Sequence, residues 1–551
     1  MLPYGSNLDI DDSRMPMGWA NLYYSEHEWK YETEPQEHAA NRIIHLPRGK
    51  FLGGSSGMNG TLMVRGTKHD YDQWAEMGNE GWAWNDVLPL FKKSEKFTPT
   101  EGFDASTDYH GQDGPLRTSV HPFAPISSAF LESFIDKGSV YKEDMFSEGE
   151  SEGAGHAVRT VYGGVRTSGA DFVNLNPPSN LSVLYNTMVA RVLMDPIPTG
   201  GPADTGTAAK GPSVTHPTYI ATGVEAHIAG PGKSDAERTL KVIKARKEII
   251  LSAGSYNSPM ILMHSGVGPR QHIEDVGIEG GCKLDLPYVG SNLEDHLVVF
   301  NVYELNKNMT NDHLFYPPGA LDASLREWHE KKTGVMGKFA FGPFAFLRID
   351  ERLRDKPEWK EALAKKGGVD PTGQLPAQPH IEYISSELYI GPPQTAPTKP
   401  DDQRHRSLAL CRPFAPPIID HAYLSNPLDL AVLAEGTKLV HEIVMEGKGT
   451  KDHVRGPWPA DGLAFPNTDE GWKQYVREHM STAFHPACTV KMGPESDPTA
   501  CVDPRLRVRG VKNLRVADIS ILPKLNNGHT QAPAYMVGEK AAILILEDNK
   551  P

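Results

Sequence analysis

The chain has 551 residues, which is too long for one compact core. We therefore expect two joined domains or one large discontinuous α/β body. Apolar residues make up 39% and charged residues 23% of the chain, which is typical of a globular enzyme and excludes disordered and fibrous classes. The net charge of −14, without any run of Lys or Arg, disfavours nucleic acid as a partner.

The cysteines and the N-terminus indicate whether the chain has a metal site, disulfide bonds or a membrane segment. Cys282, Cys411, Cys488 and Cys501 show no CxxC or His/Cys spacing, so no metal site and no disulfide framework is predicted, although Cys488 and Cys501 could pair. No apolar stretch of about 18 residues occurs, and the first residues lack a signal peptide. As written, the chain is expected to be cytoplasmic by default and not membrane-bound, or secreted if its natural N-terminus lies upstream.

The first half of the chain predicts an N-terminal extended segment over residues 1–45 and then a Gly-rich stretch. Apolar alternation predicts strands over 182–194, 219–228 and 240–252, which would form a small antiparallel meander. The Pro/Gly/Thr-rich run from Pro196 to Pro217 is predicted to be a surface loop between two of these strands.

In the second half of the chain, a loop is predicted over 391–405 and a strand over the run 408–417. Helical periodicity predicts helices over 428–446 and 470–480. The C-terminal end predicts a strand, a loop and an apolar helix that begins near Pro533.

The segment Pro47-Arg-Gly-Lys-Phe-Leu-Gly-Gly-Ser-Ser-Gly-Met-Asn-Gly60 is rich in glycine and small hydroxyl residues. Such a segment lets backbone amides approach a planar or phosphorylated ligand, which a Cβ at Gly53 or Gly54 would obstruct. By composition alone, a Gly-rich surface turn is an equally good interpretation.

A second segment, Lys247 to Pro269, reads as a β-branched run, a tight Ala-Gly-Ser turn and a helix opened by Ser258-Pro259. Free amides at the start of such a helix can hold a phosphate. The segment therefore predicts half of a nucleotide site, although strand-Gly-helix units are common in α/β proteins.

The C-terminal region carries polar residues that could contact a cofactor or a substrate. Asp518 follows a short strand and Gln531 lies near a helix start, so they could hydrogen-bond a ligand, or simply serve as turn and cap residues. His485 in Phe-His-Pro-Ala and His529 in Asn-Gly-His-Thr-Gln-Ala-Pro are two of the 22 histidines, and an isolated histidine is more often structural or on the surface than catalytic.

These segments, together with Val289-Gly-Ser-Asn-Leu-Glu-Asp-His296, resemble the signatures of the glucose-methanol-choline (GMC) oxidoreductases over nearly all of residues 20–548. The segment around His529 resembles the aryl-alcohol oxidase and glucose oxidase branches, which use two histidines. The choline branch has Asn at the position of His529. The resemblance implies an α/β fold with an FAD-binding Rossmann-like domain and a substrate domain built on an antiparallel sheet with helices. The expected regions are 1–296, mostly FAD-binding, 297–480, substrate-binding, and 481–551, the C-terminal catalytic and FAD-binding segment.

The resemblance also implies the chemistry of the site. FAD would be bound non-covalently, because Met58 stands where relatives with covalent flavin have His. His485 would be the base that takes the hydroxyl proton of a small-molecule alcohol, His529 would hold the substrate oxygen, and the hydride would go to flavin. Reoxidation by O2 or by another acceptor is left open. The expected cofactor contacts are Gly53, Gly54, Asn59, Val189, Gly254, Ala517, Asp518 and Gln531.

The chain departs from the family pattern at its start. Family members begin with a βαβ unit that carries GxGxxG and holds the ADP half of FAD, and no GxGxxG occurs in this sequence. A downstream start codon, a truncated chain, or a relative that has lost oxidation would each explain this departure. The last explanation gives the alternative function, a flavin-free pseudoenzyme or a lyase, isomerase or cyclase in small-molecule biosynthesis.

Overall fold

The fold is described from a computed structural model, which covers residues 5, 10–101, 103–120, 123–145, 147–150, 152–198, 216–229, 237–389, 416–458 and 465–550. The loop predicted over 391–405, most of the loop predicted from Pro196 to Pro217, and most of the strand predicted over 408–417 lie outside these ranges. Within the covered ranges, no helix is long and apolar enough to cross a membrane. In those ranges, no group of three His, Cys, Asp or Glu side chains converges as a metal site would require.

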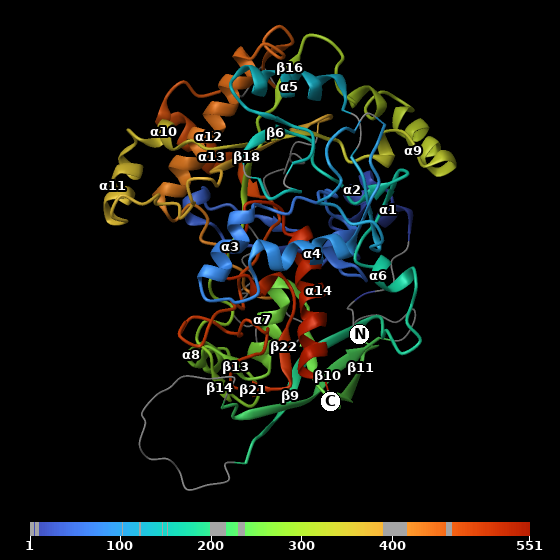
Figure 1. Cartoon of the computed structure of the whole chain (residues 1–551), viewed down its shortest axis with the longest axis vertical. Coiled ribbons are helices and arrows are strands. Elements are labelled where there is room, and N and C mark those ends of the chain that lie inside the picture. Colours follow the sequence, from blue (N-terminus) through green and yellow to red (C-terminus); the bar gives the residue numbers. More distant parts are fainter. Residues whose placement is uncertain are drawn as a thin grey trace.

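The lower part of the molecule in Figure 1 is built on a sheet whose strands follow each other as an antiparallel meander. The predicted meander is thus confirmed for its first two strands and the start of the third, and a parallel neighbour from near the C-terminus joins it. The strands are β9 (Thr187–Pro196), β10 (Tyr219–Ile228), β11 (Thr239–Lys244) and β21 (Val511–Lys512).

The strand predicted over 240–252 is divided in two. β11 ends at Lys244, and β12 (Ile249–Leu251) begins after the polar residues Arg246 to Glu248. β12 leaves the meander and pairs in parallel with β22 (Leu514–Val516) instead. The single-strand prediction was wrong because apolar alternation continues through a turn whose backbone changes sheets.

β12 leads through Ser252 and Ala253 into helix α7 (Gly254–His264), which confirms the predicted strand, turn and helix. The helix begins at Gly254, earlier than the predicted start at Ser258-Pro259. Pro259 has no N–H for the carbonyl of Ser255 one turn earlier, and Thr489 Oγ1 donates to that carbonyl at 2.6 Å instead. A side chain from the C-terminal region therefore allows proline inside this helix.

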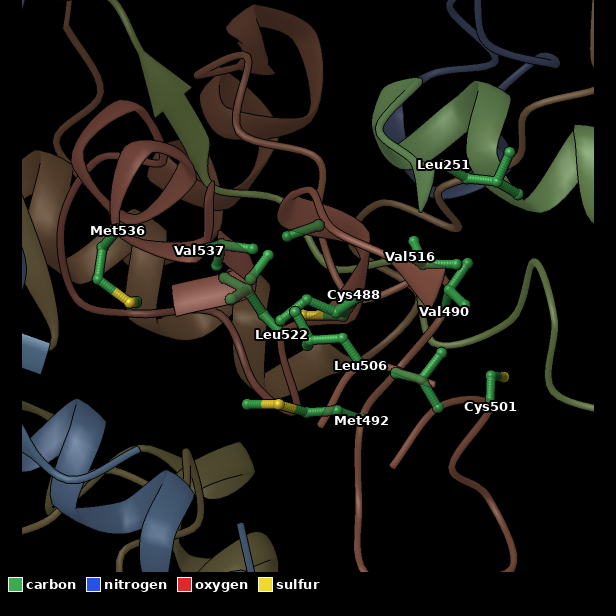
Figure 2. Packing of buried hydrophobic residues seen from close by; sticks show 14 of the residues in the cluster. Leu251, Cys488, Val490, Met492, Cys501, Leu506, Val516, Leu522, Met536 and Val537 are labelled. Carbon is green, nitrogen blue, oxygen red and sulfur yellow. The ribbon is translucent and has the colours of Figure 1, made fainter. Parts of the chain in front are cut away.

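The C-terminal segment forms the centre of the largest core. Figure 2 shows buried side chains from β12, from the segment 488–522 and from helix α14 (Gln531–Asp548) packed in one cluster. α14, whose predicted start near Pro533 is confirmed, packs against α4 (Trp84–Ser94). Cys488 and Cys501 are both free thiols whose sulfur atoms lie well apart in Figure 2, so the considered pairing is wrong.

The upper part of Figure 1 is a second sheet covered by helices. Its strand order is β18-β17-β6-β5, and the helices α5 and α12 pack on it, with α13 packing on α12. The helices predicted over 428–446 and 470–480 are confirmed as α12 and α13. The elements are β5 (Tyr141–Lys142), β6 (Gly153–Gly155), β17 (Phe341–Leu347), β18 (Ile381–Ser386), α5 (Pro125–Asp136), α12 (Pro427–Glu446) and α13 (Asp469–His479).

The two parts share segments of the chain. β5 and β6 belong to the upper sheet and α5 packs on it, although all three precede residue 297, so the region predicted as 1–296 contributes to both parts. The three-region division remains a prediction. The remaining elements are β1 (Tyr31–Glu32), β2 (His45–Leu46), η3 (Gly54–Gly57), α3 (Lys68–Glu76), β3 (Glu95–Phe97), β4 (Leu116–Thr118), β7 (Val161–Tyr162), β8 (Val165–Arg166), α6 (Asp171–Asn174), β13 (Val267–Gly268), α8 (Arg270–Asp275), β14 (Leu284–Asp285), β15 (Leu297–Val299), β16 (Tyr303–Leu305), α9 (Ala320–Lys331), α10 (Asp350–Leu353), α11 (Pro357–Lys365), β19 (Val454–Pro457), β20 (Met480–Thr482) and η8 (Ile519–Ile521).

The N-terminal segment is less extended than predicted. Two single-turn helices, α1 (Asp11–Arg14) and α2 (Trp19–Leu22), flank a 3-10 turn that begins at Pro16. Met15 and Met17 are buried against Trp328 and its neighbours, and this long-range burial holds the turns in place. Helices of four residues are too short to show a periodic pattern, so the prediction of an extended segment was wrong.

Candidate active site

One cavity lies between the two parts of the fold, with walls from β9, β12 and α7 of the lower part and from β18 and α12 of the upper part. Its volume is about 4070 Å³. Pockets for one small ligand have about 300–1,000 Å³, so this cavity has room for a large cofactor together with a substrate. Nine of the ten predicted site residues line it, namely Gly53, Gly54, Asn59, Val189, Gly254, His485, Asp518, His529 and Gln531.

Glycines form a smooth part of the wall, as the first two motifs predict. Gly53, Gly54 and Gly254 have φ values of 93°, 54° and 84°, which L side chains rarely adopt. A Cβ on Gly254 would meet no atom within 4 Å, and one on Gly54 would meet only the Gly49 carbonyl at 3.9 Å. Because both residues line the cavity, a side chain at either position would project into the space left for a ligand.

Asp518 joins the start of α7 to the turn that follows β22. Its Oδ2 accepts from the Gly254 amide at 2.9 Å and from Ser258 Oγ at 2.5 Å, and its Oδ1 accepts from the Ser520 amide at 2.8 Å. The predicted contact Ala517 is not on the cavity wall. Its amide donates to the Leu251 carbonyl at 2.8 Å, and its side chain packs against the core.

Asn59 and Gln531 are brought together, although 472 residues separate them in the sequence. The Asn59 side-chain amide donates to Gln531 Oε1, and Arg166 donates to Asn59 Oδ1 at 2.8 Å. Gln531 Nε2 in turn donates to Thr160 Oγ1 at 3.2 Å. These bonds fix the two side chains at the wall before any ligand is present.

The two candidate catalytic histidines face each other, with ring centroids 4.7 Å apart. His529 is 5% exposed, and its Nε2 lies 2.9 Å from Glu382 Oε1 on β18. The loop before His529 is held by buried Asp70, which accepts from the amide and the side chain of Asn527 at 2.9 and 2.6 Å. His529 is therefore fixed by both parts of the fold.

His485 is held from two sides by one dipeptide. Asp295 Oδ1 accepts from the His485 amide at 2.8 Å, and His296 Nδ1 lies 3.0 Å from His485 Nδ1. Burial lowers the pKa of His485 well below its usual value of 6.5, and His529, His296 and Arg48 lower it further. His485 is therefore a neutral imidazole at neutral pH and can accept a proton.

Sequence reasoning did not assign Asp295, His296 or Glu382 to the site. Asp295 and His296 belong to the segment 289–296, which the sequence analysis used only as evidence for the family. Two adjacent ionisable side chains in that segment were the signal that could have assigned them to the site. Glu382 lies within a strand without any motif, and only the pairing of β18 with β17 brings it to His529. Nothing in the sequence around Glu382 marks it.

The cavity wall fits the flavin half of FAD. The glycine surface at Gly54 and Gly254 leaves room that a Cβ would fill, and fixed amide and carboxylate groups of Asn59, Gln531 and Asp518 border it. The expected residues Gly53 and Val189 complete this wall. By the family resemblance, these residues would hold the ring and ribityl portion of FAD.

Replacing Gly254 by Ala is expected to lower the amount of FAD that copurifies with the protein, because the new methyl group would project into the cavity. Gly280 provides a matched control, since its φ of 87° is close to the 84° of Gly254 and its Cβ would also meet nothing. Both substitutions place a Cβ at a positive φ and so carry a similar backbone strain of about 1–2 kcal/mol. The FAD content, measured from the absorbance of heat-released flavin, should fall for Gly254→Ala only, and equal losses for both variants would contradict the assignment.

Comparisons with known proteins identify the family of this chain. Two family models, both described as GMC oxidoreductase, match residues 31–298 and 407–538. An oxygen-dependent choline dehydrogenase from Rhizobium etli is 33% identical over 528 residues, which cover 94% of this chain and 85% of the relative. One from Vibrio vulnificus is 32% identical and covers 94% of this chain and 84% of the relative.

Solved structures show the same fold. A variant of formate oxidase from Aspergillus oryzae has a TM-score of 0.85 and 26% identity, and the match covers 100% of this chain and 93% of that one. A fungal aryl-alcohol oxidase has a TM-score of 0.75 at 24% identity and covers 99% and 94%. The predicted α/β fold and the predicted family are thus confirmed. The chain belongs to the GMC oxidoreductases, a family of FAD-dependent enzymes.

Proposed function

We propose that the chain oxidises the hydroxyl group of a small-molecule alcohol to an aldehyde or ketone. The observation that carries this proposal is the pair of facing rings of His485 and His529 on the wall of a cavity that fits a flavin. FAD, when bound, supplies the acceptor for the hydride that leaves the alcohol carbon. The residues of the chain bind the alcohol, orient it and take its hydroxyl proton.

His485 is the proposed base. An alcohol can lose hydride only as its oxygen gives up a proton, and a neutral imidazole accepts that proton. The lowered pKa of His485 keeps the ring neutral, and the bonds to Asp295 and His296 hold it in place. The O–H electron pair becomes the second bond of the carbonyl group, so protons and electrons balance.

His529 is proposed to hold the substrate oxygen. Its ring lies next to His485, and Glu382 accepts from Nε2, which leaves the rest of the ring to face the cavity. With its Nε2–H engaged by Glu382, the ring donates to the substrate oxygen only when Nδ1 also carries a proton, and that hydrogen bond would then stabilise the negative charge that develops on the oxygen. The two rings would thus contact the same oxygen atom from different elements.

The substrate is proposed to be a moderately apolar primary alcohol. Tyr316, Phe341, Tyr383 and Tyr389 contribute aromatic side chains to the cavity wall, whereas Phe315 and Phe344 do not line it. Relatives are named for choline and for aryl alcohols, both of which carry a primary hydroxyl group. Aromatic walls suit an aryl group by ring stacking and a quaternary ammonium group by cation–π contact, so the alcohol panel below includes both kinds.

The direct test is a panel of alcohols with aliphatic, benzylic and quaternary-ammonium side chains, each given to the purified full chain. Aldehyde is measured together with hydrogen peroxide in one arm and with a reduced dye in the other, which separates O2 from another acceptor. Aldehyde formation that His485→Asn abolishes supports the proposal. A product that forms without any reduced acceptor would support the non-redox alternative.

Replacing Glu382 by Gln should lower the rate of aldehyde formation by about 10-fold. Gln can still accept from His529, but it lacks the charge that stabilises a positively charged ring, and such a charge-assisted bond is worth about 1.5–3 kcal/mol. Glu361, an exposed residue of α11, is the control, and Glu361→Gln should leave the rate unchanged. An unchanged rate in Glu382→Gln would remove Glu382 from the site.

A further inference from the structure

We propose that His296 is a positioning residue that sets the tautomer of His485, so that Nδ1 of His485 carries the proton and Nε2 is the free proton acceptor. The role of Nε2 as a base rests on the proposed function, whereas the tautomer itself does not. A neutral imidazole has one N–H and one lone pair, and only the tautomer with a lone pair toward the cavity can act there as a base.

The two rings meet through like atoms. His296 Nδ1 and His485 Nδ1 are 3.0 Å apart, and the rings are perpendicular with centroids 5.2 Å apart. At this distance one of the two nitrogens donates and the other accepts. Burial lowers the pKa of both histidines, so both rings are neutral and a single proton lies between them.

A second contact decides which ring donates. The His296 ring also makes a hydrogen bond to the backbone of Asn526 that raises its pKa, which is the effect of donation to a carbonyl. Because Nδ1 faces His485, Nε2 is the atom left to donate. A neutral His296 then has no proton on Nδ1, so His485 Nδ1 is the donor and His485 Nε2 keeps the lone pair.

Charged groups around the pair act in opposite directions. Asp295 and Glu382 favour a proton on His296, whereas His529 disfavours it. Arg48, His529 and His296 disfavour a second proton on His485. If the pair gains a proton, these fields place it on His296, whose Nδ1 then donates to His485 Nδ1 and leaves the proton of neutral His485 on Nε2. The acceptor at Nε2 is therefore present only while the pair carries no extra proton.

The backbone makes the contact rigid. β15 pairs with β20 in the register Leu297 to Thr482, and the Ala483 amide donates to the His296 carbonyl at 2.8 Å. Phe484, directly before His485, has a φ of 67°, which is strained for an aromatic residue. The pairing of the two segments therefore determines where both rings lie, and the strain is retained beside the functional residue.

The test is 15N NMR of the full chain labelled at histidine nitrogens, with the His485 signals identified by their loss in His485→Asn. At neutral pH we expect the shifts of a protonated Nδ1 and an unprotonated Nε2 for His485. A protonated Nε2 would overturn the proposal. The tautomer is read from the unsubstituted protein, and His485→Asn serves only to assign the signals.

Two substitutions at His296 separate positioning from packing. Gln can still accept from His485 Nδ1 through its amide oxygen, whereas Leu cannot. We expect His296→Leu to move the proton to Nε2 and to lower the rate of aldehyde formation by about 10- to 100-fold, as loss of an outer partner of a functional histidine usually does. His296→Gln should keep the tautomer and most of the rate. Equal losses in both variants with an unchanged tautomer would assign His296 a structural role and overturn the proposal.

The proposed tautomer and the proposed function can be contradicted independently of each other. A protonated Nδ1 in a protein that oxidises no alcohol would support the positioning role and contradict the proposed function. A protonated Nε2 in a protein that does oxidise alcohols would leave the function standing and remove His296 from it.

Discussion

We expect His485→Asn to lower the rate of flavin reduction by an alcohol by about 100- to 10,000-fold, the range typical of removing a general base. Asn retains a polar group near Asp295 and His296 but cannot take a proton from the hydroxyl group. The measurement is anaerobic stopped-flow absorbance of the bound flavin. The control is His272→Asn, because His272 is an exposed residue of α8 outside the cavity. A rate in His485→Asn close to that of the unsubstituted protein would exclude His485 as the base.

The pH profile tests the same assignment by another route. A base acts only in its neutral form, and burial together with neighbouring positive charge lowers the pKa of His485 well below 6.5. The neutral form therefore persists as the pH falls below 6.5, and the reduction rate should stay constant there. The rate should decrease only when the pH falls through the lowered pKa. A half-maximal rate near pH 6.5 would show that the ring is not buried as described.

Arg65→Met should destabilise the protein by about 3–5 kcal/mol, because it leaves a buried carboxylate without its cation. Arg65 and Glu95 are 2% and 0% exposed, and Arg65 Nη2 donates to Glu95 Oε2 at 2.9 Å. His110 Nδ1 lies 3.1 Å from the same oxygen, and His110 Nε2 lies 3.0 Å from Asp144. The free energy of unfolding, measured in urea, should recover in part in the double variant Arg65→Met with Glu95→Gln.

An exposed pair provides the control for this prediction. Lys365 and Glu361 form an ion pair on α11 with side chains 73% and 70% exposed. Lys365→Met should change the free energy of unfolding by less than about 0.5 kcal/mol, since solvent screens such pairs. Similar decreases in the free energy of unfolding for Lys365→Met and Arg65→Met would show that burial does not determine how much stability is lost with the cation of an ion pair.

The buried network also makes stability depend on pH in two directions. Burial alone would raise the pKa of Glu95, but Arg65 and His110 outweigh it and lower the pKa from 4.5 to about 2. The stability from Glu95 is therefore complete above pH 4.5 and is lost as the pH falls from 4.5 to about 2. The carboxylates of Asp144 and Glu95 raise the pKa of His110 above 6.5 despite its burial, so its contribution is lost as the pH rises beyond that value.

Elements with strong local signals could be predicted from the sequence. α12 begins after Asn426, whose side chain caps it, and has Pro427 at its first position, and α13 has a Thr468 cap. Their apolar period and caps agree, so their bounds were predicted to within one residue. The start of α7 could not be predicted, because Thr489, more than 200 residues away, compensates for Pro259.

The same distinction applies to the site. Gly54, Gly254, His485 and His529 lie in segments whose composition or resemblance marks them, and all four line the cavity. Glu382 reaches His529 only through sheet pairing in the upper part, which no local pattern encodes. The interleaving of β5 and β6 with β17 likewise depends on contacts between distant segments.

The most direct test of the account is anaerobic mixing of the purified flavoprotein with an alcohol that carries deuterium on the hydroxyl-bearing carbon. We expect the flavin absorbance to be lost in one phase, deuterium to slow this phase, and His485→Asn nearly to abolish it. A flavin that stays oxidised with every alcohol of the panel, while the protein is folded and holds FAD, would contradict oxidation of an alcohol by hydride transfer at this site.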